Sequence, residues 1–588
     1  MMTEMTRYKQ QTNLEDDDAS SVGSARTEEL PTGTTHIHYH MGSHWWKSRT
    51  GLEKALLVGW FLLLLVVTVL VALLHLQSDT PKLMVHTVLH PSGISSDSSL
   101  INKNQCLSRD CVMIAGDVLS SMDPTVDPCE DFYQYACGGW MTKNPIPEGK
   151  PIWGTLNKLS SDNQVIMRHA LESSEKAHCD AEEKAKIFYK SCMDANQTIE
   201  NLGPKPLQEL IKKSGGWSVK ERWKPPANYS ILDDLIVTKI QYGSSALFSW
   251  GVEADDKNST RHILQFDQGG LTLPARNYYL NESEKAVQNA YVDYISKIVV
   301  LLGGIKKIGD EVANDVMEVE KEIAEITMPD DERREDDKLY HLSTLSNLTN
   351  MAPFIDWTKF VKTAFQKINK PIFDSEEIVV YAPSFLQNLT NIIDTYSSTT
   401  EGKVKLHNYV IWHMAKNYVG FLSRNFRDAA KDLEKAQMGV AGTEEVWREC
   451  VAATDAALGP ALGAMYVRSA FKGHSKDLAQ DMITRIRKSF IESLASVPWM
   501  DKLTKKAAIE KATAIYEMIG YPDYILDQTE LDKKFADLRI KENEFFANNV
   551  RVNTFSIKDH LKRLSKQVNK TRWDMTPPTV NAYYSPTK

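Results

Sequence analysis

Beyond residue 106, apolar residues recur mostly at steps of three and four, the spacing of one face of an α-helix. One such stripe runs through residues 312–326, a second through 185–192 and a third through 478–494. We expect each stripe to face a hydrophobic core, which places Cys192 on a buried face. The third stripe consists of Leu478, Met482, Ile486, Phe490 and Leu494. The pattern predicts a mainly α-helical fold.

Strand patterns are sparse, and the best candidates are residues 378–382 and 580–584. A local helix signal lies at Asp127, which is an expected N-cap followed by Pro128 and, three residues on, by Glu130. We expect this short helix to carry Cys129 and Cys137 and to end at Gly138 and Gly139.

Residues 55–76 form one long apolar segment without Asp, Glu, Lys or Arg. As a helix it spans roughly 33 Å, enough to cross a hydrocarbon core of about 30 Å. A buried core helix gives a similar pattern, whereas the apolar part of a signal peptide is shorter and nearer the N-terminus. Lys47, Arg49 and Lys54 crowd the N-terminal flank, which predicts a single-pass type II protein whose C-terminal part is extracellular.

Glycosylation sequons support this topology, because all of them follow the apolar segment. Their asparagines are Asn196, Asn228, Asn258, Asn281, Asn347, Asn388 and Asn569. The seven cysteines also follow the segment, where an oxidising compartment permits disulfides. We therefore expect a large helical ectodomain at the plasma membrane, with the lipid bilayer as one partner.

The domain organisation follows from these shifts in composition. We expect a disordered cytosolic tail at 1–50, a transmembrane helix at 55–76 and a stalk at 77–105. A helical ectodomain region occupies 106–525, and 526–588 lead into a further lobe.

The formal net charge of −8 gives no support to nucleic-acid binding.

Several passages resemble, in the same order, the neprilysin family of zinc metallopeptidases, which includes endothelin-converting enzymes. They are residues 127–140, 255–259, 267–271, 273–279, 447–450, 499–501, 519–523 and 573–584. The resemblance covers residues 106–588. It implies a fold in which a large helical lobe caps a catalytic lobe. It also implies a catalytic zinc ion and peptide substrates.

The resemblance also implies roles for single residues. It implies disulfides between Cys106 and Cys111 and between Cys192 and Cys450. In the family, the cysteines that match Cys129 and Cys137 pair near the far C-terminus, and those partners do not occur here, while Cys179 matches no family cysteine.

The resemblance bears on substrate binding as well. Asn581 and Ala582 resemble the strand that holds a bound peptide's backbone in the family, although an ordinary edge strand without a binding role would have the same sequence pattern. Ile152 stands where the family has a carboxylate-binding Arg, which argues against a carboxydipeptidase preference.

The family's His-Glu-x-x-His zinc helix does not occur in these 588 residues, since none of the 15 histidines is followed by Glu. His407 and His413 are six residues apart, which puts them on different helix faces. We therefore expect no catalytic residue and no metal ligand in this chain, which we interpret as truncated before the zinc motif.

Two functions remain open from the sequence. The first is a membrane-anchored zinc metalloendopeptidase that processes or degrades extracellular peptides, of which this chain is an incomplete, inactive copy. The alternative is a non-catalytic truncated isoform that binds peptides or pairs with a full-length homologue. A homodimer and a heterodimer are both possible partners. We expect the truncated form to be retained in the endoplasmic reticulum.

Overall fold

The computed structural model describes residues 106–193, 198–440, 442, 444–471 and 473–587. The predicted tail, transmembrane helix and stalk lie outside these residues, as does Asn196. Contacts divide the chain into two units, Met1–Ser108 and Arg109–Lys588, and the elements named below belong to the second.

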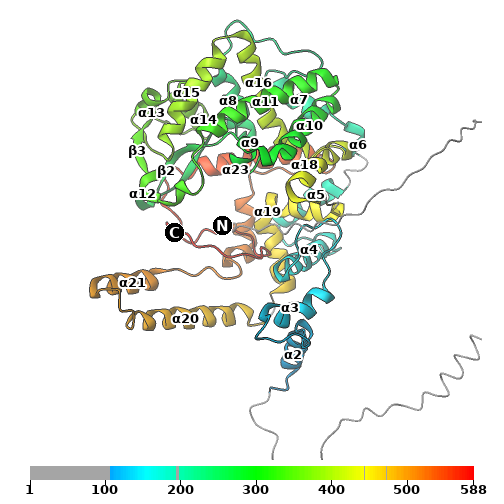
Figure 1. Cartoon of the computed structure of the whole chain (residues 1–588), viewed down its shortest axis with the longest axis vertical. Helices are drawn as coiled ribbons and strands as arrows, with labels where there is room; N and C mark the ends of the chain where they lie inside the picture. Colours follow the sequence, from blue (N-terminus) through cyan, green and yellow to red (C-terminus); the bar gives the residue numbers. More distant parts are fainter. Residues whose placement is uncertain (1–105, 194–197, 441, 443, 472, 588) are drawn as a thin grey trace, which may run out of the picture. The chain divides into compact units, whose positions relative to one another are not determined.

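Helices dominate the described residues, as the apolar periodicity predicts (Figure 1). The first are α2 (Arg109–Ser121), α3 (Phe132–Lys143), α4 (Thr155–Glu172), α5 (Asp180–Met193), α6 (Thr198–Leu202), α7 (Lys205–Lys213), α8 (Ile231–Tyr242), α9 (Asn277–Leu280), α10 (Lys285–Leu301), α11 (Lys306–Ile326), α12 (Asp336–Leu339), α13 (Leu345–Met351) and α14 (Trp357–Gln366). The rest are α15 (Pro383–Ser397), α16 (Thr400–Val419), α17 (Arg424–Asp428), α18 (Lys431–Met438), α19 (Val446–Ala470), α20 (Ser475–Leu494), α21 (Lys502–Ala514), α22 (Gln528–Lys534) and α23 (Phe545–Leu561). Short 3₁₀ turns are η2 (Glu282–Glu284), η3 (Glu332–Arg334) and η4 (Asp523–Leu526).

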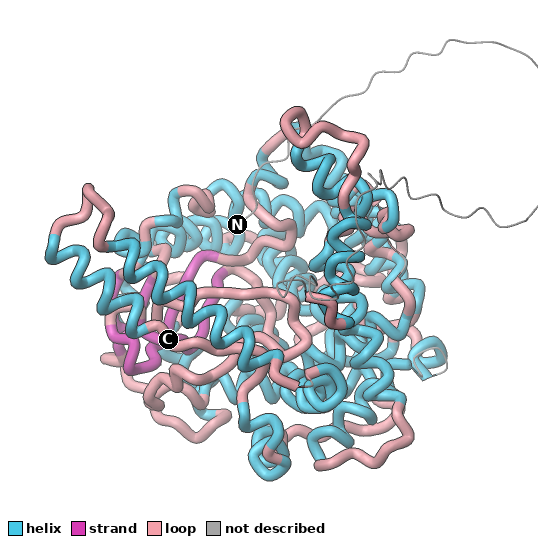
Figure 2. The backbone as a smooth tube through the Cα atoms, turned by 90° about the horizontal axis from the view of Figure 1, so that it is seen from below, coloured by secondary structure: helices cyan, strands magenta, loops and turns pink. Residues whose placement is uncertain are grey.

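One small mixed sheet lies among the helices (Figure 2). Its strands are β1 (Phe248–Asp255), β2 (Asn258–Gln268), β3 (His341–Thr344) and β4 (Glu377–Val380), in the order β1-β2-β4-β3. The pairs β1–β2 and β3–β4 are antiparallel and β2–β4 is parallel. The candidate at 378–382 therefore overlaps β4.

The prediction of a strand at 580–584 was wrong, because these residues form no regular element. Tyr583 and Tyr584 are exposed, and no neighbouring strand in the described part of the chain pairs with them. Alternation of side chains cannot make a strand without a partner backbone.

Two hydrophobic clusters hold the fold together. The larger core packs α8, α10, α11 and α14–α16 around the sheet, and Val312, Val316 and Val319 lie fully buried in it. The smaller core packs α4, α5 and α19 with α22 and the start of α23. Cys192 is buried there, as its stripe predicts.

The helix predicted from Asp127 begins later than expected. Asp131 is the N-cap of α3, and its side chain accepts a hydrogen bond from the Gln134 N–H. Cys129 therefore lies in the preceding turn. Gly139 lies inside the helix, where a β-carbon would stand 2.5 Å from the Met122 carbonyl oxygen, so glycine permits close packing of α3 against residues 120–122.

The stripe on α20 does not face a core in the described residues. Leu478, Met482, Ile486 and Phe490 are 69%, 57%, 61% and 51% exposed, and only Leu494 is buried. α20 packs beside α21 (Figure 1), which leaves this face uncovered. Periodicity shows that a helix face is apolar but not what covers it.

Candidate functional site

A cavity with a volume of about 880 Å³ opens beside the sheet. Its walls come from the end of α8, the facing ends of β1 and β2, the loop at 327–334 and the last two turns of α23. Residues 267–279 pass along one side, so two of the passages that resemble the neprilysin family line this space.

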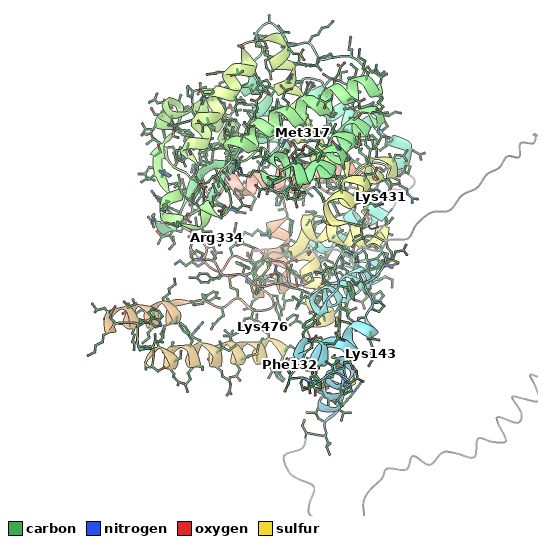
Figure 3. The ribbon with its side chains drawn as sticks, viewed as in Figure 1. Phe132, Lys143, Met317, Arg334, Lys431 and Lys476 are labelled. Carbon is green, nitrogen blue, oxygen red and sulfur yellow. A yellow bond between two sulfur atoms is a disulfide. The ribbon has the colours of Figure 1, made fainter. Side chains whose placement is uncertain are left out.

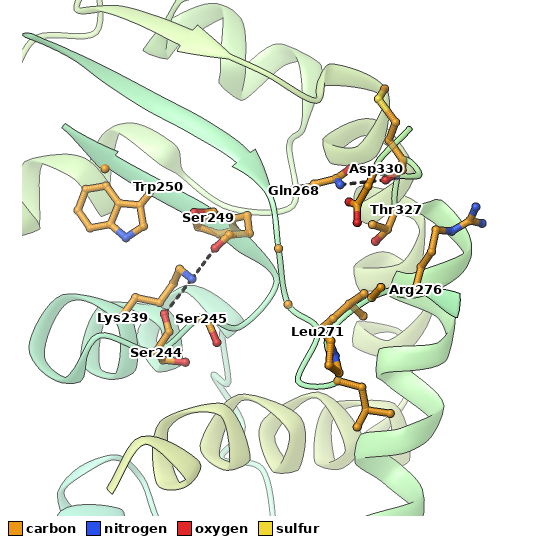
Figure 4. A pocket seen from close by; sticks show the side chains of 18 of the residues that line it. Lys239, Ser244, Ser245, Ser249, Trp250, Gln268, Leu271, Arg276, Thr327 and Asp330 are labelled. Atoms are coloured by element: carbon orange, nitrogen blue, oxygen red, sulfur yellow. Dashed lines mark hydrogen bonds between the residues drawn. The ribbon is translucent and has the colours of Figure 1, made fainter. Parts of the chain in front are cut away.

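The two sides of the cavity differ in chemistry (Figure 4). Lys239, Ser244, Ser245, Ser249 and Trp250 lie on one side. Arg276, Leu271, Thr327 and Asp330 lie on the other, and Arg334 is a further lining residue (Figure 3). Hydroxyls, apolar surface and charges of both signs can bind the amide groups, side chains and termini of a peptide.

Lys239 fixes the turn that follows α8. Its fully buried ammonium donates hydrogen bonds to the carbonyl oxygens of Ser244, Ala246 and Phe248, at 3.1, 2.7 and 2.7 Å. It also lies 4.5 Å from the centre of the Phe248 ring. Burial, aided by the charge of Lys416, lowers the pKa of Lys239 to about 7. All three of its N–H donors are nonetheless satisfied.

The same turn contains a residue in the left-handed region, since Leu247 has a φ of 63°. Its N–H donates to the Tyr409 hydroxyl at 2.8 Å, and that hydroxyl donates to the Gly270 carbonyl at 2.9 Å. Gly270 has a φ of 92°, and a β-carbon there would stand 2.5 Å from the Tyr409 oxygen. The two loops that line the cavity are thus tied to α16 through one tyrosine.

A buried carboxylate, Glu320 on α11, organises the wall behind the cavity. It accepts hydrogen bonds from Thr272 at 2.7 Å, Tyr279 at 2.5 Å, Tyr291 at 2.9 Å and His413 at 2.7 Å. Burial opposes its ionisation, but the bond from His413 and the charge of Lys416 outweigh burial and lower the pKa of Glu320. We conclude that Glu320 is an anion.

His413 on α16 lies between this carboxylate and the cavity. Its Nε2 is 2.7 Å from Glu320 Oε1, and its Nδ1 is 3.1 Å from the Ser245 hydroxyl. Burial and the charge of Lys416 lower the pKa of His413 to about 4, although Glu320 acts in the opposite direction. His413 is therefore neutral at physiological pH.

The residues that the sequence analysis assigned to substrate binding do not line this cavity. Asn581 and Ala582 are exposed on the irregular segment near the C-terminus. Ile152 is exposed and lines a separate cavity of about 370 Å³, beside Lys150 and Arg448. The structure does not bring these three residues together with the large cavity.

The disulfide between Cys192 and Cys450 agrees with the family resemblance. Cys106 and Cys111 are both in the disulfide-bonded state, while Cys129, Cys137 and Cys179 are free thiols. Every described sequon asparagine, from Asn228 to Asn569, is exposed.

No three His, Cys, Asp or Glu side chains in the described residues are grouped so that they could hold a metal ion. His407 and His413 lie in separate networks, since His407 Nδ1 is 2.8 Å from Asp234 and His413 contacts Glu320. These residues do not fit a zinc site, and no hydrolytic step through zinc is assigned to them.

Among the described helices, α19 is long and apolar enough to cross a membrane. It is mostly buried and forms part of the smaller core, so we interpret it as a core helix.

The family model for "Peptidase family M13" matches residues 128–522, more than half of the sequence. The chain belongs to this family. It is 44% identical to Neprilysin-3 of Drosophila melanogaster, over 99% of this chain and 75% of that protein. It is 39% identical to endothelin-converting enzyme 1 of Homo sapiens, over 99% of this chain and 72% of that protein.

Solved structures of similar proteins share the fold. The zinc metalloprotease ZMP1 of Mycobacterium tuberculosis, in complex with an inhibitor, superposes with a TM-score of 0.68 at 22% identity. That match covers 80% of this chain and 68% of ZMP1. PepO of Lactobacillus rhamnosis gives a TM-score of 0.67 at 16% identity, over 79% of this chain and 70% of PepO. The family model and the relatives named above, rather than these structures, make the chain a neprilysin-like member of Peptidase family M13.

The sequence patterns single out 267–271 and 273–279 as family passages without giving them a role, and these passages line the cavity. From the sequence, His413 is considered only as a possible metal ligand. The acidic residue that faces His413, Glu320, comes from a helix 93 residues earlier, and no local pattern links the two.

Proposed function

We propose that this protein is a membrane-anchored M13 protein that binds extracellular peptides in the cavity beside Ser245. The observation that carries the proposal is the cavity itself, about 880 Å³ in volume and lined by serine hydroxyls, an indole ring, arginines and aspartates. Such a mixture can bind a peptide backbone, its side chains and a charged terminus at once.

The first candidate function is zinc-dependent cleavage of peptides, because the family consists of zinc metallopeptidases. Under this proposal the cavity residues contribute substrate binding, and no zinc ligand is assigned among the described residues. Zinc would supply a polarised water as the nucleophile.

The second candidate is peptide binding without cleavage. The mixed polar and apolar lining of the cavity suits binding by itself and needs no reaction. A non-catalytic form of this kind would hold peptides or pair with a catalytic homologue.

The proposed topology places the apolar segment 55–76 in the plasma membrane and the M13 region outside the cell. The exposed asparagines of the described sequons support this placement, because glycans need accessible acceptors. The proposed role of Asn581 and Ala582 is to extend along a bound peptide, and their exposure leaves them free to do so.

Peptide binding can be tested with the purified 588-residue chain in detergent and a fluorescein-labelled peptide mixture of random sequence. Ser249→Trp places an indole in the cavity and should weaken binding, measured by anisotropy, by roughly tenfold or more. Ser346→Trp, on the exposed surface of α13, is the matched control and should bind as the parent does. Equal affinity of the two variants would contradict the assignment of the cavity.

Cleavage is tested on the same protein by mass spectrometry of unlabelled peptides, with and without added zinc. Zinc-dependent, chelator-sensitive cleavage would favour the first candidate. Binding without cleavage favours the second.

A further inference from the structure

Ser245 on the cavity wall and two buried side chains behind it are arranged in the order of a catalytic triad. Ser245 Oγ lies 3.1 Å from His413 Nδ1, and His413 Nε2 lies 2.7 Å from Glu320 Oε1. The three come from the turn after α8, from α16 and from α11, so the fold and not the local sequence assembles them. A nucleophile, a base within hydrogen-bond reach and a group that orients the base define such a site.

The hydrogen-bond partners of His413 determine which of its ring nitrogens carries the proton. A neutral imidazole carries one N–H, and the Glu320 carboxylate can only accept a hydrogen bond. The proton therefore lies on Nε2, which leaves Nδ1 as an acceptor for the Ser245 hydroxyl. This is the tautomer that a general base needs.

Accessibility differs along the triad as catalysis requires. Ser245 is exposed where it lines the cavity, whereas the side chains of His413 and Glu320 are completely buried. A ligand in the cavity can therefore reach the Ser245 hydroxyl, while the base and the carboxylate lie behind it. The turn is also held rigid by Lys239 and contains the left-handed Leu247, and backbone strain of this type clusters at active sites.

We propose that Ser245 is a nucleophile that takes the acyl group of esters or other activated acyl compounds that enter the cavity. The Ser245 oxygen bonds to the acyl carbon while its proton passes to His413 Nδ1, and Glu320 stabilises the imidazolium. The bond to the alcohol breaks, and the alcohol leaves with that proton. Water then attacks the acyl-serine and gives a proton to His413, which passes it to the Ser245 oxygen as the acyl–oxygen bond breaks and the acid leaves.

Neighbouring serines supply internal controls. Ser244 is buried, and its hydroxyl accepts a hydrogen bond from the Ala246 N–H at 3.3 Å. Ser249 lines the same cavity and is exposed, but no histidine among the described residues hydrogen-bonds to its hydroxyl. Of these three serines, Ser245 is the one that combines access with a base.

The test uses the purified full-length chain and a fluorophosphonate probe, which transfers its phosphonyl group to an activated serine and releases fluoride. Peptide mapping should place the adduct on Ser245. Ser245→Ala should lower the labelling rate by roughly 100-fold, whereas Ser346→Ala, on the exposed surface of α13 and outside the cavity, should label like the parent. Equal labelling of a folded Ser245→Ala protein, or an adduct elsewhere, would overturn the proposal.

A second measurement does not depend on the probe. In Ser245→Cys the thiol gains His413 as a base, so iodoacetamide should alkylate it several-fold faster at pH 7 than the thiol of Ser249→Cys. Equal alkylation rates would show that His413 does not activate this position. Neither measurement requires peptide binding, so these outcomes are independent of the proposed function.

Discussion

Cys192 near the end of α5 is bonded to Cys450 near the start of α19, 258 residues further along the chain. Both sulfurs lie in the smaller core, where α5 and α19 pack against each other. The bond therefore fixes a long-range contact that the unfolded chain would otherwise lose.

Replacement of both residues by alanine should lower the free energy of unfolding by about 2–5 kcal/mol. Urea denaturation under non-reducing conditions measures the change. Cys129→Ala, which removes an exposed free thiol, is the control and should leave stability unchanged. A double variant as stable as the parent would show that the packing of α5 and α19 suffices alone.

The neutral state of His413 predicts acid sensitivity. Its folded pKa of about 4 lies below the unfolded value of 6.5, so below pH 6.5 the unfolded chain binds a proton that the folded chain does not. Stability should therefore fall as the pH falls from 6.5 towards 4, by up to about 3 kcal/mol. Glu320 on α11, Lys416 and Tyr409 on α16 and Lys239 on α8 face or surround this ring.

Urea denaturation at pH 7.5 and pH 5.0 measures this dependence. His413→Gln should reduce the difference between the two pH values, whereas His474→Gln, at a side chain that is 88% exposed, should not. An unchanged difference in His413→Gln would assign the acid sensitivity to other groups.

The uncovered face of α20 predicts a contrast between two substitutions. Ile486→Ser should change the free energy of unfolding by less than about 0.5 kcal/mol, because the side chain is already exposed. Leu494→Ala on the same helix should cost about 2 kcal/mol, because Leu494 is buried. Light scattering should also show less self-association of the serine variant. A large stability loss in Ile486→Ser would mean that this face is covered.

Gly270 should tolerate no side chain. Gly270→Ala combines a left-handed backbone with a close contact to Tyr409, and should cost about 2 kcal/mol or more. Gly420→Ala is the matched control, since Gly420 has a φ of −64° and a β-carbon placed there would meet nothing within 4 Å. Thermal denaturation of both variants should show a loss only in the first.

The proposed topology predicts N-glycans on the exposed sequons. Protein from glycosylating mammalian cells should gain mobility on a gel after enzymatic removal of N-glycans. Mass spectrometry should find glycans at sites such as Asn228 and Asn388, both exposed. Unmodified asparagines at all sites would contradict an extracellular M13 region.

The sequence predicted the helical class and the buried stripe at 312–326, because helical periodicity is local. It did not predict β1 and β2, whose pairing depends on contacts across the hairpin. It misplaced the start of α3, because Asp127 and Asp131 both suit an N-cap: Asp131 caps the helix, while the Asp127 side chain accepts from the Cys129 N–H in the preceding turn.

The candidate site was less predictable than the fold. Ser245, His413 and Glu320 are separated by 75 residues or more, and each looks ordinary in its own segment. Their proximity depends on how α8, α11 and α16 pack, which no spacing rule encodes.

The two phenylalanines at the start of α23 belong to different cores. Phe545 lies against Phe188 in the smaller core, whereas Phe546 lies against Tyr418 in the larger one. One peptide bond thus joins the two hydrophobic clusters, and a change in the packing of one displaces a side chain of the other. Cooperativity between them is therefore built into a single helix turn, and heating should melt both in one transition.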